Sequence, residues 1–357
     1  MPKQYRKPDY IIIAVTAFLV LIGLLMIFSA SFEFRYLQKQ LISLVIAVSC
    51  FLLGFNLDYH LYKKMVTPLL GVTALFLLLT YVPGIGHTAG GASRWLNFGI
   101  IIFQPSELAK LAVIIFLALS LENKGAKVKD FWKGIGPILL GVGVIMALII
   151  KQPDLGTAMV IAMVTGLMIL VGGMQVWQFL IVSVIGVRMV YWIIEHNQYQ
   201  KDRILAFMDP WKHYLGIGFH TVQSLLAVGS GGILGLGLGN SRQKFSYLPE
   251  PFTDYIFAII CEELGFLGAF VVVILFAIIA FRGVRIARLA PDRFGMLLAF
   301  GITSLITMEA ILNMSVVLAL VPPTGIPLIF VSFGGTSLMI SLMSIGILAN
   351  ISKQIPL

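Results

Sequence analysis

Residues 10–31 read YIIIAVTAFLVLIGLLMIFSAS, an apolar run that contains no charged side chain. A helix needs roughly 20 apolar residues to cross the hydrocarbon core of a bilayer. Inside that core every backbone N–H and C=O group must be paired within the protein, which makes a helix the expected conformation of such a run. The run is too long for a cleaved signal peptide, so it predicts a membrane-spanning helix.

The rest of the chain has the same character. Of its 357 residues, 59% are hydrophobic and 11% are charged, and the mean hydropathy is +0.98. Soluble domains carry about 25% charged residues, so this composition excludes a water-soluble enzyme, a disordered protein and a nucleic-acid-binding domain. The expected fold is an all-α integral membrane protein, a single polytopic membrane domain over residues 1–357. Ten transmembrane helices are expected near residues 10–31, 36–55, 66–82, 105–121, 134–151, 157–173, 176–195, 255–281, 295–320 and 326–351.

Basic residues predict the orientation of these helices, since Lys and Arg gather in short cytoplasmic loops. With the N-terminus in the cytoplasm, ten spans place five basic segments on the inner side and make both termini cytoplasmic. These segments contain Lys3, Arg6 and Lys7; Lys63 and Lys64; Lys124, Lys127, Lys129 and Lys133; Arg282, Arg285, Arg288 and Arg293; and Lys353. The net charge of +9 is therefore interpreted as a cytoplasmic bias. Cys50 and Cys261 lie in apolar sequence and are expected to be free, buried thiols.

Two segments on the opposite side are long, residues 83–104 and residues 196–254. The second is large enough to build a site, because it mixes charged and aromatic side chains with glycine. It includes the glycine-rich apolar run 228–239, which is too short and too flexible for a spanning helix. This large outer loop before the eighth span is therefore expected to contain re-entrant or interfacial segments.

Asp254 lies where the large outer loop returns to the membrane. Chemistry alone leaves two interpretations open. The carboxylate either stabilises a helix start, which is worth ~0.3–1 kcal/mol through the helix dipole, or acts as a general base beneath a cationic loop. Glu262 and Glu263 follow in the next helix, and a rise of about 1.5 Å per residue puts them roughly 12 Å or more away. That distance exceeds the ~5–9.5 Å between glycosidase carboxylates, which disfavours a two-carboxylate hydrolase.

Several other polar residues fall within or beside expected spans. Glu107 and Lys110 are three residues apart and share one helix face, although a charge at the bilayer centre costs at least ~2.5–3.5 kcal/mol. They form either an ion pair near the interface or the lining of a water-filled outer cavity. Asp154 either caps the next helix or serves the site. Glu309 is expected to be protonated or paired with a basic residue such as Arg188.

Short polar and glycine-rich motifs occur along nearly the whole chain. They are RWLN (94–97), QPSELAK (104–110), QPDLGT (152–157), DPW (209–211), QSL (223–225), GSGG (229–232), GLGLG (235–239), LPE (248–250), TD (253–254), EELG (262–265), PTG (323–325) and SFGGTSL (332–338). Each motif is weak alone. In this order, the set resembles the shape, elongation, division and sporulation (SEDS) family of bacterial peptidoglycan glycosyltransferases.

The resemblance implies ten transmembrane helices and polymerisation of lipid II on the outer face of the bacterial cytoplasmic (inner) membrane. An acceptor sugar hydroxyl attacks the anomeric carbon of a glycan carried on undecaprenyl pyrophosphate. The family's essential aspartate maps onto Asp254, which ranks the general base above the helix cap. The resemblance also implies a class B penicillin-binding protein, a transpeptidase, as partner. Lipid II, undecaprenyl-linked glycan and membrane lipids are the other expected partners, and no nucleic acid is expected.

A pyrophosphate leaving group needs its negative charge neutralised, which makes cations the expected substrate-binding groups. The candidates are Arg94, Lys110, Arg203, Arg242 and Lys244, with Arg94 alternatively an interfacial anchor. Glu107 and Asp154, with Gln152 in the same motif, are expected to orient these cations or a divalent cation such as Mg²⁺ or Mn²⁺. Backbone amides of residues 229–239, or of Ser332, Gly334 and Gly335, are expected to form an anion nest. Apolar grooves between helices are expected to hold the polyprenyl chains.

The chain also departs from the family pattern. Phe252 stands where a histidine usually precedes the Thr-Asp pair, so no imidazole relay is available from that position. Glu309 stands where glutamine is frequent. Residues 243–247 favour the FtsW and SpoVE branch over the RodA branch. A lipid II flippase and a scaffold that activates a transpeptidase remain alternatives, but acids and glycines gathered on one face favour an enzyme over a transporter with a midplane site.

Overall fold

The computed structural model describes residues 7–31, 33–89, 92–97, 99, 102–241 and 252–356. Helices dominate these residues, with one small antiparallel sheet in the order β1-β2-β3. The helices are α1 (Tyr10–Ser31), α2 (Phe34–Asn56), α3 (Leu61–Leu79), α4 (Pro105–Lys124), α5 (Gly136–Lys151), α6 (Leu155–Val171), α7 (Val176–Glu195), α8 (Gln198–Met208), α9 (Phe219–Gly231), α10 (Ile256–Leu289), α11 (Arg293–Val317) and α12 (Gly335–Lys353). The strands are β1 (Gly86–Ala89), β2 (Ala92–Asn97) and β3 (Ile102–Phe103), and a 3₁₀ turn (Gly125–Lys129) and a π turn (Phe131–Ile135) lead into α5.

Each of the ten expected spans overlaps one of these helices. Within the described residues, eight helical segments are long and apolar enough to cross a membrane. The other two expected spans contain α4, which carries charged side chains in its first and last turns, and α6, which is shorter. The chain is therefore an all-helical, multi-pass membrane protein.

Two predicted boundaries were wrong. Helix α3 begins at Leu61 rather than near residue 66, because its first turns accommodate Lys63 and Lys64. The last span was expected from residue 326, but α12 begins only at Gly335. Residues 318–334 are non-helical, and most of residues 326–332 are buried. Irregular backbone is tolerated at this depth where protein surrounds it and satisfies its polar groups.

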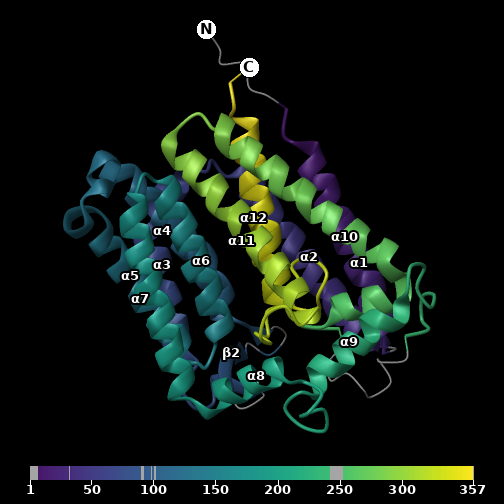
Figure 1. Ribbon diagram of the computed structural model, residues 1–357. Coiled ribbons are helices and arrows are strands. Elements are labelled where there is room, and N and C mark those ends of the chain that lie inside the picture. The colour runs from purple at the N-terminus through teal and green to yellow at the C-terminus, as the bar shows by residue number, and fades with distance from the viewer. Residues whose placement is uncertain are drawn as a thin grey trace.

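Both chain ends lie at the same end of the bundle (Figure 1). There the backbone N–H of Asp9 donates to the Ser352 hydroxyl oxygen at 3.0 Å. We call this the terminal end, and we call the opposite end, which carries α8, α9 and the sheet, the loop end. Helix α11 contacts α4 and α6 on one side and α10 and α12 on the other, so it joins the two halves of the bundle.

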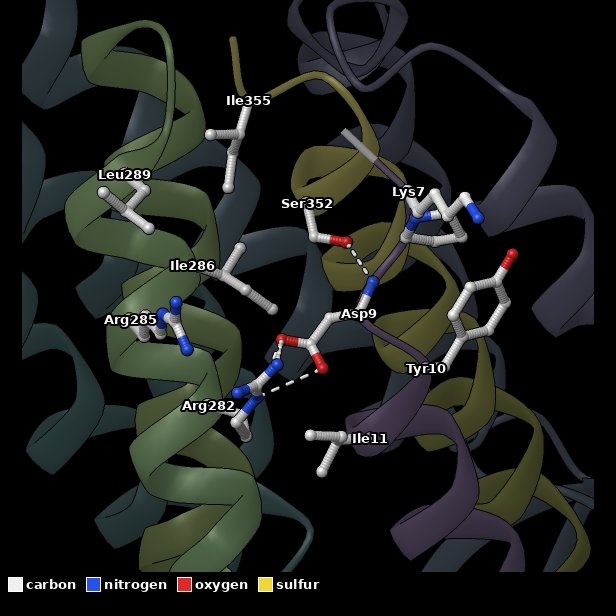
Figure 2. Close-up of a pocket in the computed structure, with 11 residues that line it drawn as sticks. Lys7, Asp9, Tyr10, Ile11, Arg282, Arg285, Ile286, Leu289, Ser352 and Ile355 are labelled. Carbon is white, nitrogen blue, oxygen red and sulfur yellow. Dashed lines mark hydrogen bonds and ion pairs between the residues drawn. The ribbon is translucent and has the colours of Figure 1, made fainter. Parts of the chain in front are cut away.

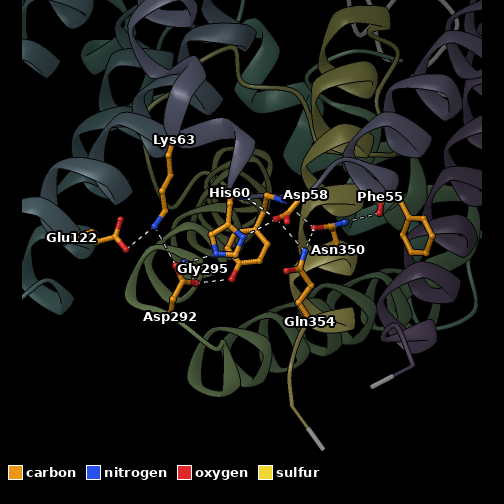
Figure 3. A network of polar contacts seen from close by, with 10 residues as sticks. Phe55, Asp58, His60, Lys63, Glu122, Asp292, Gly295, Asn350 and Gln354 are labelled. Atoms are coloured by element: carbon orange, nitrogen blue, oxygen red, sulfur yellow. Dashed lines mark hydrogen bonds and ion pairs between the residues drawn. The ribbon is translucent and has the colours of Figure 1, made fainter. Parts of the chain in front are cut away.

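A polar network closes the terminal end (Figure 3). The Lys63 ammonium contacts Glu122 of α4 at 2.8 Å and Asp292, which caps α11, at 3.3 Å. The hydroxyl of Tyr59 also donates to Asp292, at 2.6 Å. The turn between α2 and α3 is thereby fixed to α4 and α11.

Glycines bring α2 and α12 into close contact. A Cβ atom at Gly54 would lie 2.6 Å from the Met343 carbonyl oxygen, and one at Gly346 would lie 2.3 Å from the Phe51 carbonyl oxygen. Real Cβ contacts are longer, so the two backbones pack at a distance that only glycine permits. Small residues are the usual means of close helix packing in membranes.

The glycine-rich run 228–239 ends α9 and then packs against a break in α10. The break lies at Gly265, which has φ 67° and ψ −168°. The N–H of Leu236 donates to the Glu262 carbonyl at 2.9 Å, and the N–H of Phe266 donates to the Gly232 carbonyl at 2.9 Å. The run therefore satisfies the backbone groups that the break in α10 frees.

Candidate active site at the loop end of the bundle

Asp254 lies in the turn 252–255, immediately before α10. Hydrogen bonds from α11 and the segment 318–334 hold three successive carbonyl groups of this turn. The donors are Phe333 N–H to the Phe252 carbonyl (2.8 Å), the Ser332 hydroxyl to the Thr253 carbonyl (2.6 Å) and the Asn313 side-chain amide to the Asp254 carbonyl (2.7 Å). These three hydrogen bonds therefore fix the backbone that carries the half-buried Asp254 carboxylate.

Arg203 of α8 lies on the same loop as Asp254. A Cβ atom at Gly325 would be 3.5 Å from the Asp254 Oδ2 atom and 3.9 Å from the Arg203 Nη2 atom. Gly325 has φ +73°, so both the space and the backbone conformation favour glycine. The guanidinium also lies 4.5 Å from the Tyr199 ring centroid and donates to its hydroxyl at 2.6 Å. A carboxylate and a cation are therefore gathered around one glycine.

An imidazole stands beside this pair. The His220 ring stacks on the Tyr255 ring with centroids 5.9 Å apart and an interplanar angle of 14°. Burial, and then the nearby Arg203 cation, lower the pKa of His220 below its ordinary value of 6.5. The ring is therefore neutral at neutral pH.

An apolar cavity of about 220 Å³ adjoins Arg203. Its walls come from four helices and from residues 321–324. They are Leu155, Gly156 and Met159 of α6; Val190 and Ile194 of α7; Gln200, Arg203 and Ile204 of α8; Leu312 of α11; and Val321, Pro322, Pro323 and Thr324. The cavity has a predominantly hydrocarbon lining with a cation at one side.

Lys110 lies deeper in the bundle, between two carboxylates. Its ammonium contacts Glu107 of the same helix at 2.8 Å and Glu309 of α11 at still shorter range. All three side chains are at most 5% exposed. They are enclosed between α4 and α11 instead of lining an open, water-filled cavity. The partner of Glu309 is therefore Lys110 and not Arg188, which packs over the Tyr191 ring of α7.

Asp154 caps helix α6. Its carboxylate accepts hydrogen bonds from the Thr157 N–H at 3.2 Å and the Thr157 hydroxyl at 2.9 Å. Arg94 braces the preceding turn by donating to the carbonyls of Gln152, at 3.1 Å, and Pro153. The Gln152 side chain donates in turn to Thr80 of the α3 terminus at 2.8 Å. Arg94 and Gln152 are thus brought together, and these polar contacts of Arg94, Gln152 and Asp154 are with the ends of α3, α5 and α6.

Ser332, Gly334 and Gly335 lie behind the turn that carries Asp254. The Ser332 hydroxyl accepts from the Leu328 N–H at 2.8 Å besides donating to that turn. The Gly334 N–H donates to Gln40 of α2 at 3.3 Å. The Gly334 amide therefore already has a structural partner, and so do the amides of the run 228–239 that donate to α10. Arg242 and Lys244 lie outside the described residues.

The described carboxylates do not form a metal site. Among these residues, no three His, Cys, Asp or Glu side chains gather as they would around a metal ion. Glu107 and Asp154, the residues expected to orient a divalent cation, are engaged with Lys110 and with the start of α6. We therefore assign no part of the reaction to a divalent cation.

The sequence did not single out three contributors to the site. Asn313, Tyr199 and His220 come from different elements, and no local pattern marks them as neighbours of Asp254. The departure at Phe252 indicated only that no imidazole relay is available from that position, and it did not point to another histidine. The structure provides one from α9, 34 residues earlier in the chain than Asp254.

Known proteins resemble the chain over almost its full length. Residues 9–356 match the FTSW_RODA_SPOVE family model, described as "Cell cycle protein". Stage V sporulation protein E of Bacillus subtilis is 39% identical over 362 residues, which cover 99% of each chain. An FtsW protein of Geobacter sp. (strain M18), described as a probable peptidoglycan glycosyltransferase, is 40% identical over 355 residues, or 97% of each chain.

Solved structures show the same fold. A chain of a peptidoglycan synthase complex, reported for its coordination of polymerization and crosslinking, has a TM-score of 0.83 and 27% identity over 98% of each chain. The rod shape determining protein RodA of Thermus thermophilus has a TM-score of 0.73 and 25% identity, over 98% of this chain and 97% of RodA.

Proposed function

We propose that this chain, which belongs to the FTSW_RODA_SPOVE family of cell cycle proteins, polymerises lipid II into glycan strands with Asp254 as the general base. Two relatives, 38% and 40% identical over nearly their full length, are named probable peptidoglycan glycosyltransferases. The chain is accordingly a peptidoglycan glycosyltransferase. The residue assignment rests on one observation. The Asp254 carboxylate and the Arg203 guanidinium both lie close to Gly325, beside an apolar cavity.

The reaction is placed on the outer face of the bacterial inner membrane. The loops 57–60, 125–135 and 290–292 and the described residues beside the start of α1 and the end of α12 carry or adjoin the described residues of the five basic segments. They lie at the terminal end, since successive long helices alternate in direction along the chain. The positive-inside tendency then assigns the terminal end to the cytoplasm and the loop end to the outside. This orientation supports ten crossings in one membrane domain, with both termini inside.

In the proposed step, Asp254 accepts the proton of the acceptor sugar hydroxyl as the oxygen bonds to the anomeric carbon of the donor. The bond between that carbon and the pyrophosphate oxygen breaks, and undecaprenyl pyrophosphate leaves with the electron pair. General base catalysis of this kind contributes about 10²–10⁴-fold. The hydrogen bonds to the carbonyls of the turn 252–254 keep the backbone that carries the carboxylate in position.

Arg203 is the cation assigned to the leaving group. Its guanidinium presents donors that match phosphate oxygens, and it lies between the carboxylate and the apolar cavity. A polyprenyl chain in that cavity would bring its pyrophosphate to Arg203 and its sugar to Asp254. The residues then proposed to support the site are Arg94 of β2, Glu107 and Lys110 of α4, and Gln152 and Asp154 of the turn between α5 and α6.

The lipid II flippase is the weaker alternative. A flippase needs a site near the midplane that opens alternately to the two sides. Here the carboxylate, the cation and the cavity all lie at the loop end, and the relatives' names describe glycosyltransferases. The similar chain from a synthase complex supports a class B penicillin-binding protein as partner, and the first relatives support the FtsW and SpoVE branch.

A polymerisation assay tests this assignment. Labelled lipid II is supplied to the full chain with its class B partner, and Asp254→Asn is compared with Asp202→Asn. Asp202 is a matched control because it lies next to Arg203 on α8 and only accepts from Gln198, at 2.8 Å. We expect Asp254→Asn to lose at least about 100-fold in rate, with Asp202→Asn near wild type. Equal rates for wild type and Asp254→Asn would show that this carboxylate is not the base.

A further inference from the structure

A second cavity, of about 330 Å³, lies at the terminal end between the start of α1 and the end of α10. Figure 2 shows Arg282 and Arg285 on the α10 side and Lys7 and Tyr10 on the α1 side. Ser352 of α12 and Ile355 complete the lining with apolar residues of α1 and α10. The volume falls within the roughly 300–1,000 Å³ typical of ligand sites. The cavity is at the opposite end of the bundle from Asp254, so the proposed reaction does not use it.

The charges in this cavity are unbalanced. Arg282 is already paired, because its Nε and Nη2 atoms contact the Asp9 carboxylate at 2.8 and 2.6 Å. Asp9 also accepts from the Ile12 N–H and so begins α1. Arg285, one turn further along α10, has no ion-pair partner among the described residues. Lys7 adds a third positive charge, and the positive end of the α1 dipole also lies here.

The surroundings of the cavity are those of a membrane interface. Tyr10 is 62% exposed, Ile11 49% and Leu289 41%. An exposed tyrosine beside apolar side chains is typical of the headgroup level of a bilayer. Figure 2 shows Ile11 on the deeper side of the basic groups and Leu289 and Ile355 on their terminal side, so apolar side chains flank the cations both toward the bilayer centre and toward the terminal end.

We propose that this cavity binds the phosphodiester headgroup of an anionic phospholipid from the inner leaflet. Arg285 and Lys7 neutralise the phosphate, the Arg282–Asp9 pair fixes the wall between α10 and α1, and the acyl chains run past Ile11 toward the bilayer centre. Basic pockets between membrane helices on the cytoplasmic side are known to hold anionic headgroups. A soluble phosphate compound shares the charge but cannot use the exposed apolar rim, which favours the lipid. The choice of leaflet rests on the orientation proposed above.

The test compares two arginines of the same helix. Arg285→Gln removes the unpaired cation of the cavity, whereas Arg288→Gln removes an exposed arginine one turn away that does not line it. The full chain is purified in detergent, incubated with phosphatidylglycerol or phosphatidylcholine, and the retained lipids are counted by native mass spectrometry. Lys7→Gln is a second variant of the cavity, and glycerol 3-phosphate serves as a soluble competitor. Melting temperatures verify that each variant is folded.

We expect the wild type and Arg288→Gln to retain phosphatidylglycerol in preference to phosphatidylcholine. Arg285→Gln and Lys7→Gln should each lower this preference about fivefold, the effect of one basic side chain near an anionic membrane surface. Equal losses in Arg285→Gln and Arg288→Gln would overturn the site, since a diffuse surface charge would then explain the binding. Displacement by millimolar glycerol 3-phosphate would overturn the lipid as its ligand. Because no outcome depends on polymerisation, failure here leaves the Asp254 assignment intact.

Discussion

Replacing Lys110 by methionine removes the cation that contacts the buried carboxylates of Glu107 and Glu309. Methionine has a similar volume, so the change acts on charge more than on packing. The contacts suggest that Lys110 holds α4 to α11, whereas the sequence suggested that it binds a pyrophosphate. The two roles predict different behaviour of the Lys110→Met variant: a structural role lowers stability, and a substrate role lowers lipid binding in a stable protein.

The expected loss of stability is large. Two unit charges 4 Å apart attract by about 4 kcal/mol at an effective dielectric constant of 20, and Lys110 lies closer than that to both carboxylates. Removing one partner from a buried ion pair typically costs about 3–5 kcal/mol, because the other partner stays charged without compensation. Lys110→Met leaves two such carboxylates. Glu309→Gln keeps the contact between Lys110 and Glu107 and should cost much less.

Thermal unfolding of the full chain in detergent measures this difference. Cys261 is 6% exposed in the fold, so a thiol-reactive fluorophore reports its exposure on unfolding, in a Cys50→Ser background. We expect the melting temperature to fall strongly for Lys110→Met and little for Glu309→Gln. The triple variant Lys110→Met, Glu107→Gln, Glu309→Gln should recover much of the loss, because it leaves no buried charge unpaired.

Two results would refute this reasoning. If Lys110→Met melts like the wild type but loses lipid II binding, Lys110 is a substrate ligand and not a link between helices. If the triple variant is no more stable than the single one, the loss comes from packing rather than from unpaired carboxylates.

Three further predictions concern other parts of the chain. Gly346→Leu should lower the melting temperature or prevent folding, because the new side chain meets a carbonyl of α2, whereas Gly71→Leu, which has open space, should not. Ser332→Ala removes the hydrogen bond accepted from the Leu328 N–H and the one donated to the Thr253 carbonyl. Loss of the second, worth about 1 kcal/mol, should lower the polymerisation rate about fivefold without changing lipid II affinity. Burial and the nearby Arg203 cation lower the pKa of folded His220, so the unfolded chain binds more protons below pH 6.5. Melting temperature should therefore fall as the pH drops below 6.5, and His220→Gln should reduce this slope.

The helices could be predicted because each span is defined by its own residues. A run such as residues 10–31 must be helical in a bilayer whatever it packs against. The same argument failed at residues 326–334, whose composition is equally apolar. There the polar groups are satisfied by Asn313 and Ser332, which the local sequence does not reveal. Hydropathy detects burial in lipid or protein, but not which of the two surrounds the backbone.

Residues of the site could be predicted only where a sequence motif or a charged side chain marked them. Asp254 was identified by its place after the Leu-Pro-Glu segment, and Arg203 by its charge in the outer loop. Their common neighbour, Gly325, lies 71 residues beyond Asp254. Its role is to leave room beside the two side chains, and a sequence pattern does not reveal such a close approach. The glycines of the run 228–239 were expected to bind anions because exposed amides do so. The amides of Leu236 and Gly237 instead pair with α10 carbonyls near the break at Gly265, while the Gly239 amide donates to the Ser29 hydroxyl of α1.

Glu309 shows most directly why pairing within the membrane needs the structure. Glutamine is frequent at this position in the family, so an acid here adds a buried negative charge that must be compensated. From the sequence, Glu309 was expected to be protonated or paired with a basic residue of a span, with Arg188 as the example. The structure selects Lys110, 199 residues earlier in the chain, because α11 contacts α4 while Arg188 lies on the weakly packed α7. With two carboxylates on one ammonium, α4 and α11 are joined by a charged contact that glutamine would make only as a hydrogen bond. The chain should therefore tolerate Glu309→Gln far better than any change that leaves both acids without Lys110.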